Sequence, residues 1–446
     1  MRHMDLKQSI FVSIASYRDA ELIPTLHDMI AMSSGLYTIN IVICWQDNND
    51  INHFLDNGMT LVEENKHENH NLYILDYLNT QISVLSIHYF LSEGACWARK
   101  NCEQLYQGED YFLQIDSHCR FIKDWDEKMV TLHTQLKEKC ESPVLSTYPP
   151  GYQPGKESAK ETFTSRLVYR NFSSEGILQL SSVGFESSAP IRGSYLAGGF
   201  IFSEGSFVID VPNDPQIFFE GEEISMAARA FTHGYDIWHP HEILLWHFYG
   251  RDDHPKIWSD HSDDAKKVGS IDKVWWDRDR KSKEKIKILL KNDEAESDSN
   301  ALYSLGEKRS LGEYEKIAGV DFRRCCVRPE VVSKERCSYF DDDKEDWRKD
   351  LINANKKLIT VPKDKISDVF EKISKLHIGV YCNSNNLLER KVLQKEEIKK
   401  ALNEKNKEEI KIKLNFITSP ELKPSVVRIS PYLSDQGWGE IMEIAW

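Results

Sequence analysis

The most informative stretch of this sequence is DYFLQIDSH, residues 110–118. Its first six residues are mostly apolar, as in a buried strand, and the polar tripeptide Asp116-Ser117-His118 follows them directly. Three similar apolar runs lie upstream: IFVSIA (10–15), INIVICW (39–45) and QISVLS (81–86). A helical pattern, GACWARKNCEQLY (94–106), precedes the strand at 110–115. This alternation of strands and helices predicts an α/β fold with a parallel sheet.

Polar residues follow three of these predicted strands. Ser16-Tyr17-Arg18 comes after the first strand, Gln46-Asp47 after the second, and Asp116-Ser117-His118 after the fourth. Ligands of open parallel sheets bind at the carboxyl ends of the strands. We therefore expect these three clusters to meet at one binding site.

Asp116 and His118 offer a carboxylate and an imidazole to one divalent cation. They are two residues apart in an extended chain, so both side chains point the same way. Mixed oxygen and nitrogen ligands favour Mn²⁺ among the common ions, with Mg²⁺ as the alternative. A third ligand has to come from a distant segment, and both His247 and His254 qualify. Without such a partner, the tripeptide also fits a polar strand end that binds nothing.

Other segments carry weaker predictions. Asp19 is expected to cap a helix that buries Leu22, Leu26, Met29 and Ile30. Residues 147–188, rich in Pro, Gly, Ser and Tyr, are expected to form a long excursion over the sheet edge. The remaining expectations are a strand at 197–202, an acidic helix start at 221–225, an exposed linker at 292–300, a solvated helix at 388–412, and strands at 411–418 and 425–430.

Composition excludes several classes of protein. The 446 residues include 57 basic and 71 acidic side chains, and a net charge of −14 argues against nucleic acid as the main partner. No apolar run reaches the length of a transmembrane helix. The nine cysteines contain no CxxC pair, which favours a reducing, cytoplasmic setting and disfavours a structural zinc site. The oligomeric state stays open, with a homo-oligomer as one option.

Several motifs, taken in order, resemble those of glycosyltransferases with the GT-A fold, whose core is a Rossmann-like nucleotide-sugar-binding domain. GACWARK (94–100) followed by a strand and an Asp-containing motif is the nucleotide-sugar pattern of that fold. The motifs DSHC (116–119), AGGF (197–200), GEEIS (221–225) and HFYGR (247–251) are similar to those of the polypeptide N-acetylgalactosaminyltransferases.

A closer resemblance is to the cytoplasmic N-acetylglucosaminyltransferases that modify hydroxyproline on a protein, and to their bacterial relatives. It rests on IFVSIASYRD (10–19), YPPGY (148–152) and LYSLG (302–306) through Asp321-Phe322, and it covers roughly residues 8–325. The implied organisation is a GT-A domain at 8–280, a family-type extension at 281–330, and a smaller α+β or β accessory domain of unknown role at 331–446.

The resemblance implies roles for individual residues. Asp116, His118 and His247 would hold Mn²⁺ against the diphosphate of a UDP-sugar, and Arg99 would contact the diphosphate or the sugar. The remaining residues implied in donor binding are Ser16, Tyr17, Arg18, Gln46, Gly198, Gly199 and Arg251. Glu222 and Glu223 would lie beside the sugar and the acceptor, although both also fit a plain charge effect at a helix N-terminus.

The implied function is a Mn²⁺-dependent, retaining transfer of a sugar, with N-acetylglucosamine as the best guess, from a UDP-sugar to a hydroxyl of a protein or glycan. Because the families it resembles retain anomeric configuration, front-face transfer is expected. The alternative, a double displacement, would need a carboxylate nucleophile, for which Glu223 is the candidate. Alternatives are a capsule or surface polysaccharide transferase and a non-catalytic carbohydrate-binding protein with a degenerate transferase fold. A metal-dependent hydrolase is less favoured, because no second carboxylate-rich cluster is present in the sequence.

Overall fold

The chain folds into two compact units. In the computed structural model, the N-terminal unit comprises Met1–Arg323 and Cys337–Asp342, and the C-terminal unit comprises Arg324–Arg336 and Asp343–Trp446. The structure describes residues 7–156, 159–291, 301–367, 370–403 and 408–446. The linker predicted at 292–300 lies outside the described residues.

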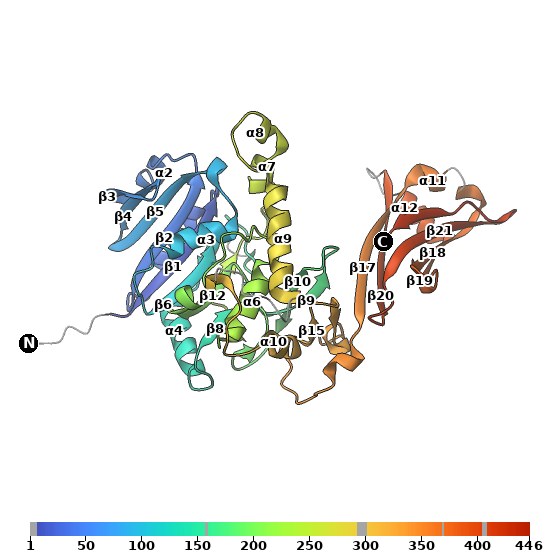
Figure 1. Cartoon of the computed structure of the whole chain (residues 1–446). Helices are drawn as coiled ribbons and strands as arrows, with labels where there is room; N and C mark the ends of the chain where they lie inside the picture. Colours follow the sequence, from blue (N-terminus) through green and yellow to red (C-terminus); the bar gives the residue numbers. More distant parts are fainter. Residues whose placement is uncertain (1–6, 157–158, 292–300, 368–369, 404–407) are drawn as a thin grey trace, which may run out of the picture. The chain divides into compact units, whose positions relative to one another are not determined.

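The N-terminal unit is built on a ten-stranded mixed sheet (Figure 1). The strand order is β11 (Ile191–Arg192), β13 (Asp236–His239), β8 (Pro143–Ser146), β12 (Phe200–Glu204), β6 (Tyr111–Asp116), β1 (Ser9–Tyr17), β2 (Thr38–Asp47), β5 (Thr80–His88), β4 (His70–Tyr77) and β3 (Thr60–His67). Strands β6, β1, β2 and β5 are parallel, as the alternation of strands and helices predicts. The predicted α/β class is therefore confirmed.

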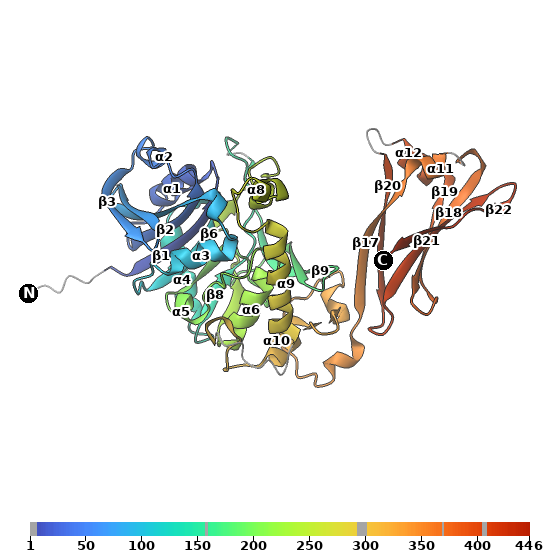
Figure 2. The same cartoon turned by 45° about the horizontal axis from the view of Figure 1, so that its top comes forward.

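Helices cover both faces of the parallel strands. Ile10, Val12 and Ile14 of β1 point into a buried core shared with helices α1 and α4. The opposite face of β1 and β2 carries α3 (Figures 1 and 2). The helices of this unit are α1 (Leu22–Ala31), α2 (Asn52–Leu55), α3 (Ala95–Glu103), α4 (Trp125–Leu136), α5 (Phe207–Asp210), α6 (Glu222–Thr232), α7 (Ile257–Asp260), α8 (Asp263–Lys267), α9 (Trp275–Lys291) and α10 (Leu311–Ala318).

Two hairpins are absent from the sequence prediction. The first, β3–β4, adds antiparallel strands to the edge of the sheet, next to β5. Most of β3 is exposed, so its sequence, TLVEENKH, lacks the buried apolar period that reveals a strand. The second hairpin pairs β9 (Thr164–Phe172) with β10 (Leu178–Phe185) inside the segment predicted as a long excursion. That segment is therefore an ordered hairpin with flanking loops.

Arg229 ties the end of the N-terminal unit to helix α6. Its side chain is fully buried, and its guanidinium donates to the carbonyl oxygens of Pro212 (2.7 Å), Leu302 (3.2 Å) and Ser304 (3.4 Å). Helix α6 packs against both α9 and α10 (Figure 2). One buried cation thus satisfies three carbonyls and fixes the segment that resembles the family extension.

The C-terminal unit contains two antiparallel sheets. Strands β17 (Asn353–Pro362) and β20 (Glu409–Thr418) form one. The other has the order β19 (Leu387–Gln394), β18 (Ile373–Cys382), β21 (Pro424–Leu433) and β22 (Gly437–Trp438), with β23 (Met442–Ala445) also on β21. Their apolar residues share one core with α11 (Lys363–Ser367) and α12 (Lys395–Leu402). A small domain of α+β or β type is what the sequence predicts.

One secondary-structure prediction in this unit is wrong. The expected solvated helix at 388–412 is instead strand β19, helix α12 and the first residues of β20. The many Lys and Glu residues of this stretch alternate with apolar residues in β20, where every second side chain is buried. The separately predicted strands at 411–418 and 425–430 are confirmed as β20 and β21. None of the described helices is long and apolar enough to span a membrane.

Replacing Arg229 with Ala is expected to lower the free energy of unfolding of the N-terminal unit by about 3 kcal/mol, because the buried guanidinium loses its hydrogen bonds to three backbone carbonyls, at about 1 kcal/mol each. Urea titration followed by tryptophan fluorescence measures the change. Arg280→Ala, which removes an exposed Arg from α9, is the control and should change it by less than about 0.5 kcal/mol. Equal effects of the two substitutions would contradict the assignment.

Candidate functional site

A cavity of about 710 Å³ opens at the carboxyl ends of the parallel strands. It brings together residues of the three polar clusters, which lie at the carboxyl ends of β1, β2 and β6. The predicted site residues that line it are Tyr17, Gln46, Arg99, Asp116, His118, Gly199, Glu222, Glu223, His247 and Arg251. Three further predicted residues, Ser16, Arg18 and Gly198, do not line it.

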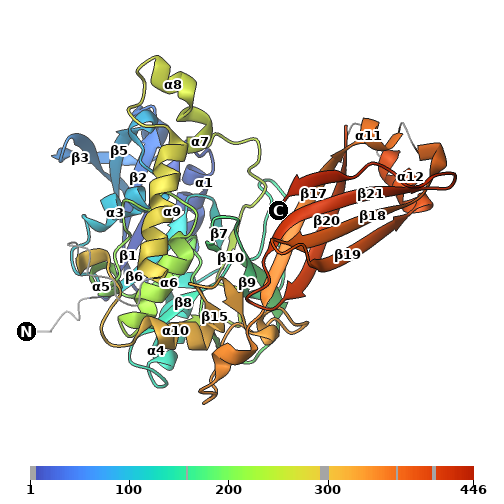
Figure 3. The same ribbon diagram turned by 45° about the vertical axis from the view of Figure 1, so that its right-hand side comes forward.

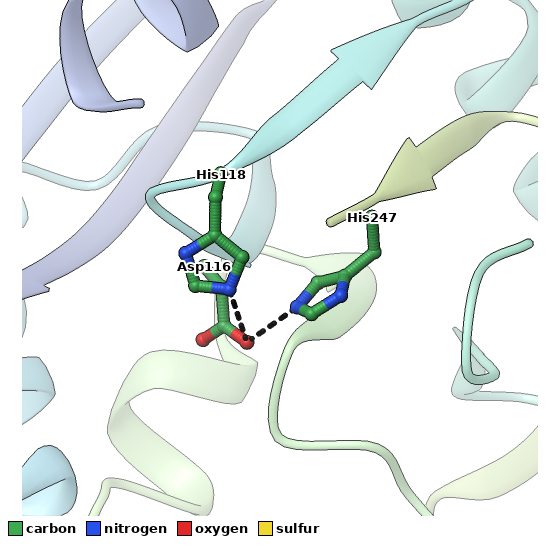
Figure 4. Close-up of side chains that lie close together, drawn as sticks. All are labelled: Asp116, His118 and His247. Carbon is green, nitrogen blue, oxygen red and sulfur yellow. Dashed lines mark hydrogen bonds and ion pairs between the residues drawn. The ribbon is translucent and has the colours of Figure 1, made fainter. Parts of the chain in front are cut away.

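Asp116, His118 and His247 form a compact group of potential metal ligands (Figure 4). Oδ2 of Asp116 lies 3.1 Å from Nε2 of His247 and 4.0 Å from Nε2 of His118. His247 reaches the site because β14 (Leu245–His247) pairs with β7 (Cys119–Phe121), which puts His247 opposite Cys119. His254 is not part of the group, and its ring packs against Phe248.

Asp19 orients His118 toward this group. Its Oδ2 lies 2.7 Å from Nδ1 of His118, accepts a hydrogen bond from Ser117 Oγ at 2.6 Å, and forms an ion pair with Arg251 at 3.1 Å. Nε2 of His118 is thereby left facing Asp116, as a carboxylate behind a metal-binding histidine does. The prediction that Asp19 caps a helix is wrong: α1 begins at Leu22 without a side-chain cap.

The protonation states suit a divalent cation. Burial would raise the pKa of Asp116, but the hydrogen bond from His247 and the charge of Arg99 outweigh it and hold this pKa far below its usual range. Burial lowers the pKa of His247, which keeps its imidazole neutral. An ionised carboxylate and a neutral imidazole are the forms that bind metals. The residues present therefore fit a cation such as Mn²⁺.

A second acidic group in the N-terminal unit is filled by a side chain. Glu175, Glu220 and Asp279 surround the ammonium of Lys283 at 2.5, 2.7 and 2.8 Å. The buried lysine occupies the place that a metal would take. Of the two acidic groups with metal-site geometry among the described residues, only the one at Asp116 faces the cavity without a competing cation in its centre.

Arg99 joins the metal-ligand group to helix α6. Its guanidinium donates to Oδ1 of Asp116 at 3.2 Å and pairs with Oε1 of Glu222 at 2.9 Å, and the side chain is only 5% exposed. Cys96 donates to the other oxygen of Glu222. Arg99 therefore balances two carboxylates from opposite sides of the site.

Two glycines allow these carboxylates to sit so close together. A Cβ at Gly198 would lie 2.1 Å from Oε1 of Glu222, and one at Gly199 would lie 2.6 Å from Oδ2 of Asp116. The family resemblance assigns these glycines to donor binding. The structure adds a second reason for them, because any side chain here would collide with Glu222 or Asp116. Strand β12 begins at Phe200, so the predicted strand start at Ala197 is wrong, and residues 197–199 form a turn.

Glu223 lies next to Glu222 in the first turn of α6 but is bound differently. It accepts hydrogen bonds from the hydroxyl of Tyr148 and from the backbone N–H of Gly198. Burial, assisted by the charge of Glu222, raises its pKa to about 7. Tyr148 comes from the segment between β8 and β9, and no pattern in the sequence indicates that the two side chains meet.

The residues predicted for the uridine side are held by internal contacts. Gln46 donates to the carbonyl of Ser16 at 3.2 Å and lines the cavity. Arg18 and Tyr17 both bind Asp260 of α7, at 2.8 Å each. Arg18 therefore points to Asp260 and is not among the residues that line the cavity. Neither Asp260 nor Asp19 was predicted as a site residue. For Asp19 a signal was available, because it directly follows the polar cluster Ser16-Tyr17-Arg18.

A family model and several solved structures match this chain. The family model described as "Glycosyltransferase (GlcNAc)" matches residues 9–324. No curated protein matches the chain. Among solved structures, the crystal structure of GalNAc-T7 with UDP, GalNAc and Mn²⁺ is 14% identical, with a TM-score of 0.40, covering 55% of this chain and 44% of that one.

A second similar protein is TarS of S. aureus. Its fragment 1–349 is 13% identical, with a TM-score of 0.32, covering 54% of this chain and 60% of that one. The longer TarS structure is 10% identical, with a TM-score of 0.34, and the match covers 98% of this chain and 77% of that one. The chain thus spans less than two thirds of the first two structures.

The family model covers more than half of the chain. The matched part includes all three potential metal ligands and both glycines of the turn. The N-terminal unit has an α/β architecture, and the chain belongs to the Glycosyltransferase (GlcNAc) family.

Proposed function

We propose that this protein transfers a sugar from a UDP-sugar to a hydroxyl group of a protein or glycan acceptor, with retention of anomeric configuration. Mn²⁺ held by Asp116, His118 and His247 is the proposed cofactor, with Mg²⁺ as the alternative. The observation that carries the proposal is the convergence of these three ligand atoms in the cavity of about 710 Å³ at the carboxyl edge of the sheet. N-acetylglucosamine is the proposed donor sugar, which agrees with the description of the family.

The chain's own residues would bind the donor and hold it. The metal would supply positive charge to the leaving diphosphate. His118 is kept in one orientation by Asp19, so its free nitrogen is ready before the ligand arrives. Arg99 forms ion pairs with both Asp116 and Glu222. A cation in this position would add positive potential at the side of the cavity where the diphosphate would bind.

Glu223 fits a hydrogen-bonding role better than a nucleophilic one. Both of its oxygens already accept hydrogen bonds, from Tyr148 and from Gly198. A pKa near 7 also leaves much of it protonated at neutral pH, and a protonated carboxyl is a poor nucleophile. This arrangement favours front-face transfer, in which the leaving phosphate helps to deprotonate the acceptor.

The acceptor and the location of the protein are proposed only as broad classes. The narrower resemblance to hydroxyproline-modifying transferases favours a protein hydroxyl, whereas a role in capsule or surface polysaccharide synthesis favours a glycan. A cytoplasmic setting is supported by the nine cysteines, which are thiols in the structure.

The deciding experiment for the proposed transfer is a UDP-release assay over a panel of UDP-sugars with Mn²⁺, run with and without EDTA. No EDTA-sensitive release from any donor would overturn the proposal.

Asp116→Ala and His247→Ala should each weaken Mn²⁺-dependent binding of UDP by about 100-fold or more, because each removes a metal ligand. Isothermal titration calorimetry with and without Mn²⁺ measures the loss. His254→Ala is the matched control, since it removes the histidine that the sequence alone left as a rival. A loss in the control and none in His247→Ala would reverse the assignment of the third ligand.

Asp19→Asn should lower the affinity for Mn²⁺ by about 10- to 100-fold without removing a ligand, because it withdraws the carboxylate that orients His118. Mn²⁺ binding followed by electron paramagnetic resonance gives the affinity directly. Asp264→Asn, an exposed change on α8, serves as the control. An affinity unaltered by Asp19→Asn would show that His118 needs no such support.

Glu223→Gln should stabilise the protein at pH 8 by about 1–3 kcal/mol and leave it almost unchanged at pH 5. The raised pKa of Glu223 means that the folded state keeps a proton that the unfolded state releases above pH 4.5, so stability falls as the pH rises from 4.5 toward 7. Glutamine removes that penalty. Urea unfolding at both pH values is the measurement, with exposed Glu138→Gln as the control. A gain at pH 5 equal to that at pH 8 would refute the titration as its cause.

A further inference from the structure

The five-stranded sheet of the C-terminal unit has one face in the core and one in solvent. On β18, Leu376, Ile378 and Val380 are fully buried, whereas Lys375 and His377, which alternate with them, are only half-buried. Strand β21 lies next to β18 (Figure 3). Burial alternates in the same way along most of β21. The outer side of this sheet is therefore free to carry side chains that serve something other than stability.

Aromatic rings gather on that outer side. The ring of Trp438 on β22 lies 5.0 Å from Tyr432 and 5.6 Å from His377, almost perpendicular to both. Trp438 is 56% exposed, so one face of a large apolar ring is presented to solvent. An indole held upright by two neighbouring rings is a rigid surface on which a flat ligand ring can stack.

Cationic side chains lie among these rings. The ammonium of Lys375 stands 5.0 Å over the ring of Tyr432. Arg390 and Arg428 flank Gly379, because the register pairs Gly379 with both. A Cβ at Gly379 would come within 3.1 Å of three atoms of the Tyr381 ring, which lies over this position beneath the guanidinium of Arg428.

We call this set of side chains the outer-sheet patch; its members are Lys375, His377, Arg390, Arg428, Tyr432 and Trp438. Four residue steps along the strands and three strand spacings across them give an area of about 13 by 14 Å. That area is long enough for more than one sugar ring of an extended chain.

The charge of the patch favours an anion. Within the part of the chain that the structure describes, Arg428 pairs with Glu443 at 2.7 Å, while Lys375 and Arg390 have no acidic partner. The whole C-terminal unit has 24 Lys and Arg against 19 Asp and Glu, a net charge of +5. The N-terminal unit has 33 against 52, a net charge of −19.

We propose that the outer-sheet patch binds a segment of an anionic polysaccharide, which is the acceptor chain of the sugar transfer. This identification of the ligand as acceptor rests on the function proposed above. Trp438 stacks on a sugar ring, and Lys375 and Arg390 bind the acid groups of neighbouring residues. His377 supplies a polar edge for hydroxyl groups between them.

Two other ligands fit the patch less well. The cores of protein interfaces are depleted of charged residues, whereas here three cations are interleaved with the rings. Single-stranded nucleic acid also stacks on aromatic rings beside cations. Its successive bases stack on successive rings, whereas Trp438 is the ring of the patch that is more than half exposed, and Tyr432 and His377 are half-buried.

Affinity electrophoresis of the full chain tests the proposal. Native gels containing alginate, which carries a carboxylate on each sugar, should retard the protein, and gels containing neutral dextran should not. Trp438→Ala should weaken retardation by about 10-fold, on the scale of losing one stacked ring, and Arg390→Glu should weaken it further at low salt. Trp276→Ala, an exposed tryptophan of α9, and Lys411→Ala, an exposed lysine of the other sheet, are the matched controls.

Three outcomes would overturn the proposal. They are equal retardation of wild type and Trp438→Ala by alginate, retardation by poly(dT) but not alginate, and dissociation of an oligomer by Trp438→Ala with polymer binding intact, measured by sedimentation. Circular dichroism of each variant checks that it is folded.

The two proposals fail separately. Asp116→Ala should keep its retardation by alginate, because the change lies in the N-terminal unit. If wild type releases UDP from a UDP-sugar but Trp438→Ala binds alginate normally, the patch is wrong and the transfer stands. If no UDP-sugar is used but binding depends on Trp438, the transfer is wrong and the patch still binds an anionic polymer.

Discussion

The site depends on the electrostatic balance around Arg99. One buried guanidinium holds Asp116 from strand β6 and Glu222 from helix α6, two carboxylates that would otherwise repel each other in a poorly solvated place. Charges removed from water are costly unless they are paired. Arg99 is what allows an acidic metal-ligand group and an acidic helix start to share one cavity, and the tight turn at Gly198-Gly199 gives them the space.

Much of this arrangement could be predicted from the sequence, for an identifiable physical reason. The central parallel strands are buried on both faces, so their apolar runs are continuous, and the polar residues that follow each run mark the carboxyl edge. The position of Tyr17, Gln46 and Asp116 at strand ends was therefore enough to predict that they meet in one cavity. The position of His247 could not be predicted in this way, because it depends on the pairing of β14 with β7.

Other features depend on contacts that no local pattern records. Asp19 appeared to be a helix cap, because capping and the support of a distant histidine call for the same side chain. The hairpin β3–β4 is held by backbone pairing at the sheet edge and leaves no apolar period. Strand β19 lies in a run rich in Lys and Glu residues and shows no strict alternation of burial, so no apolar period marks it. For Asp19, the deciding partner, His118, is far away in the sequence.

The exposed strand β3 bears on how these molecules behave at high concentration. It closes one side of a sheet ten strands wide, and an unpaired strand of this kind is an open template for another chain. Its outward side chains include Glu63, Glu64 and Lys66, and its pairing with β4 is interrupted by an irregularity between Leu61 and Glu63. Charge and a broken register both discourage a foreign strand from docking, so this edge itself opposes aggregation.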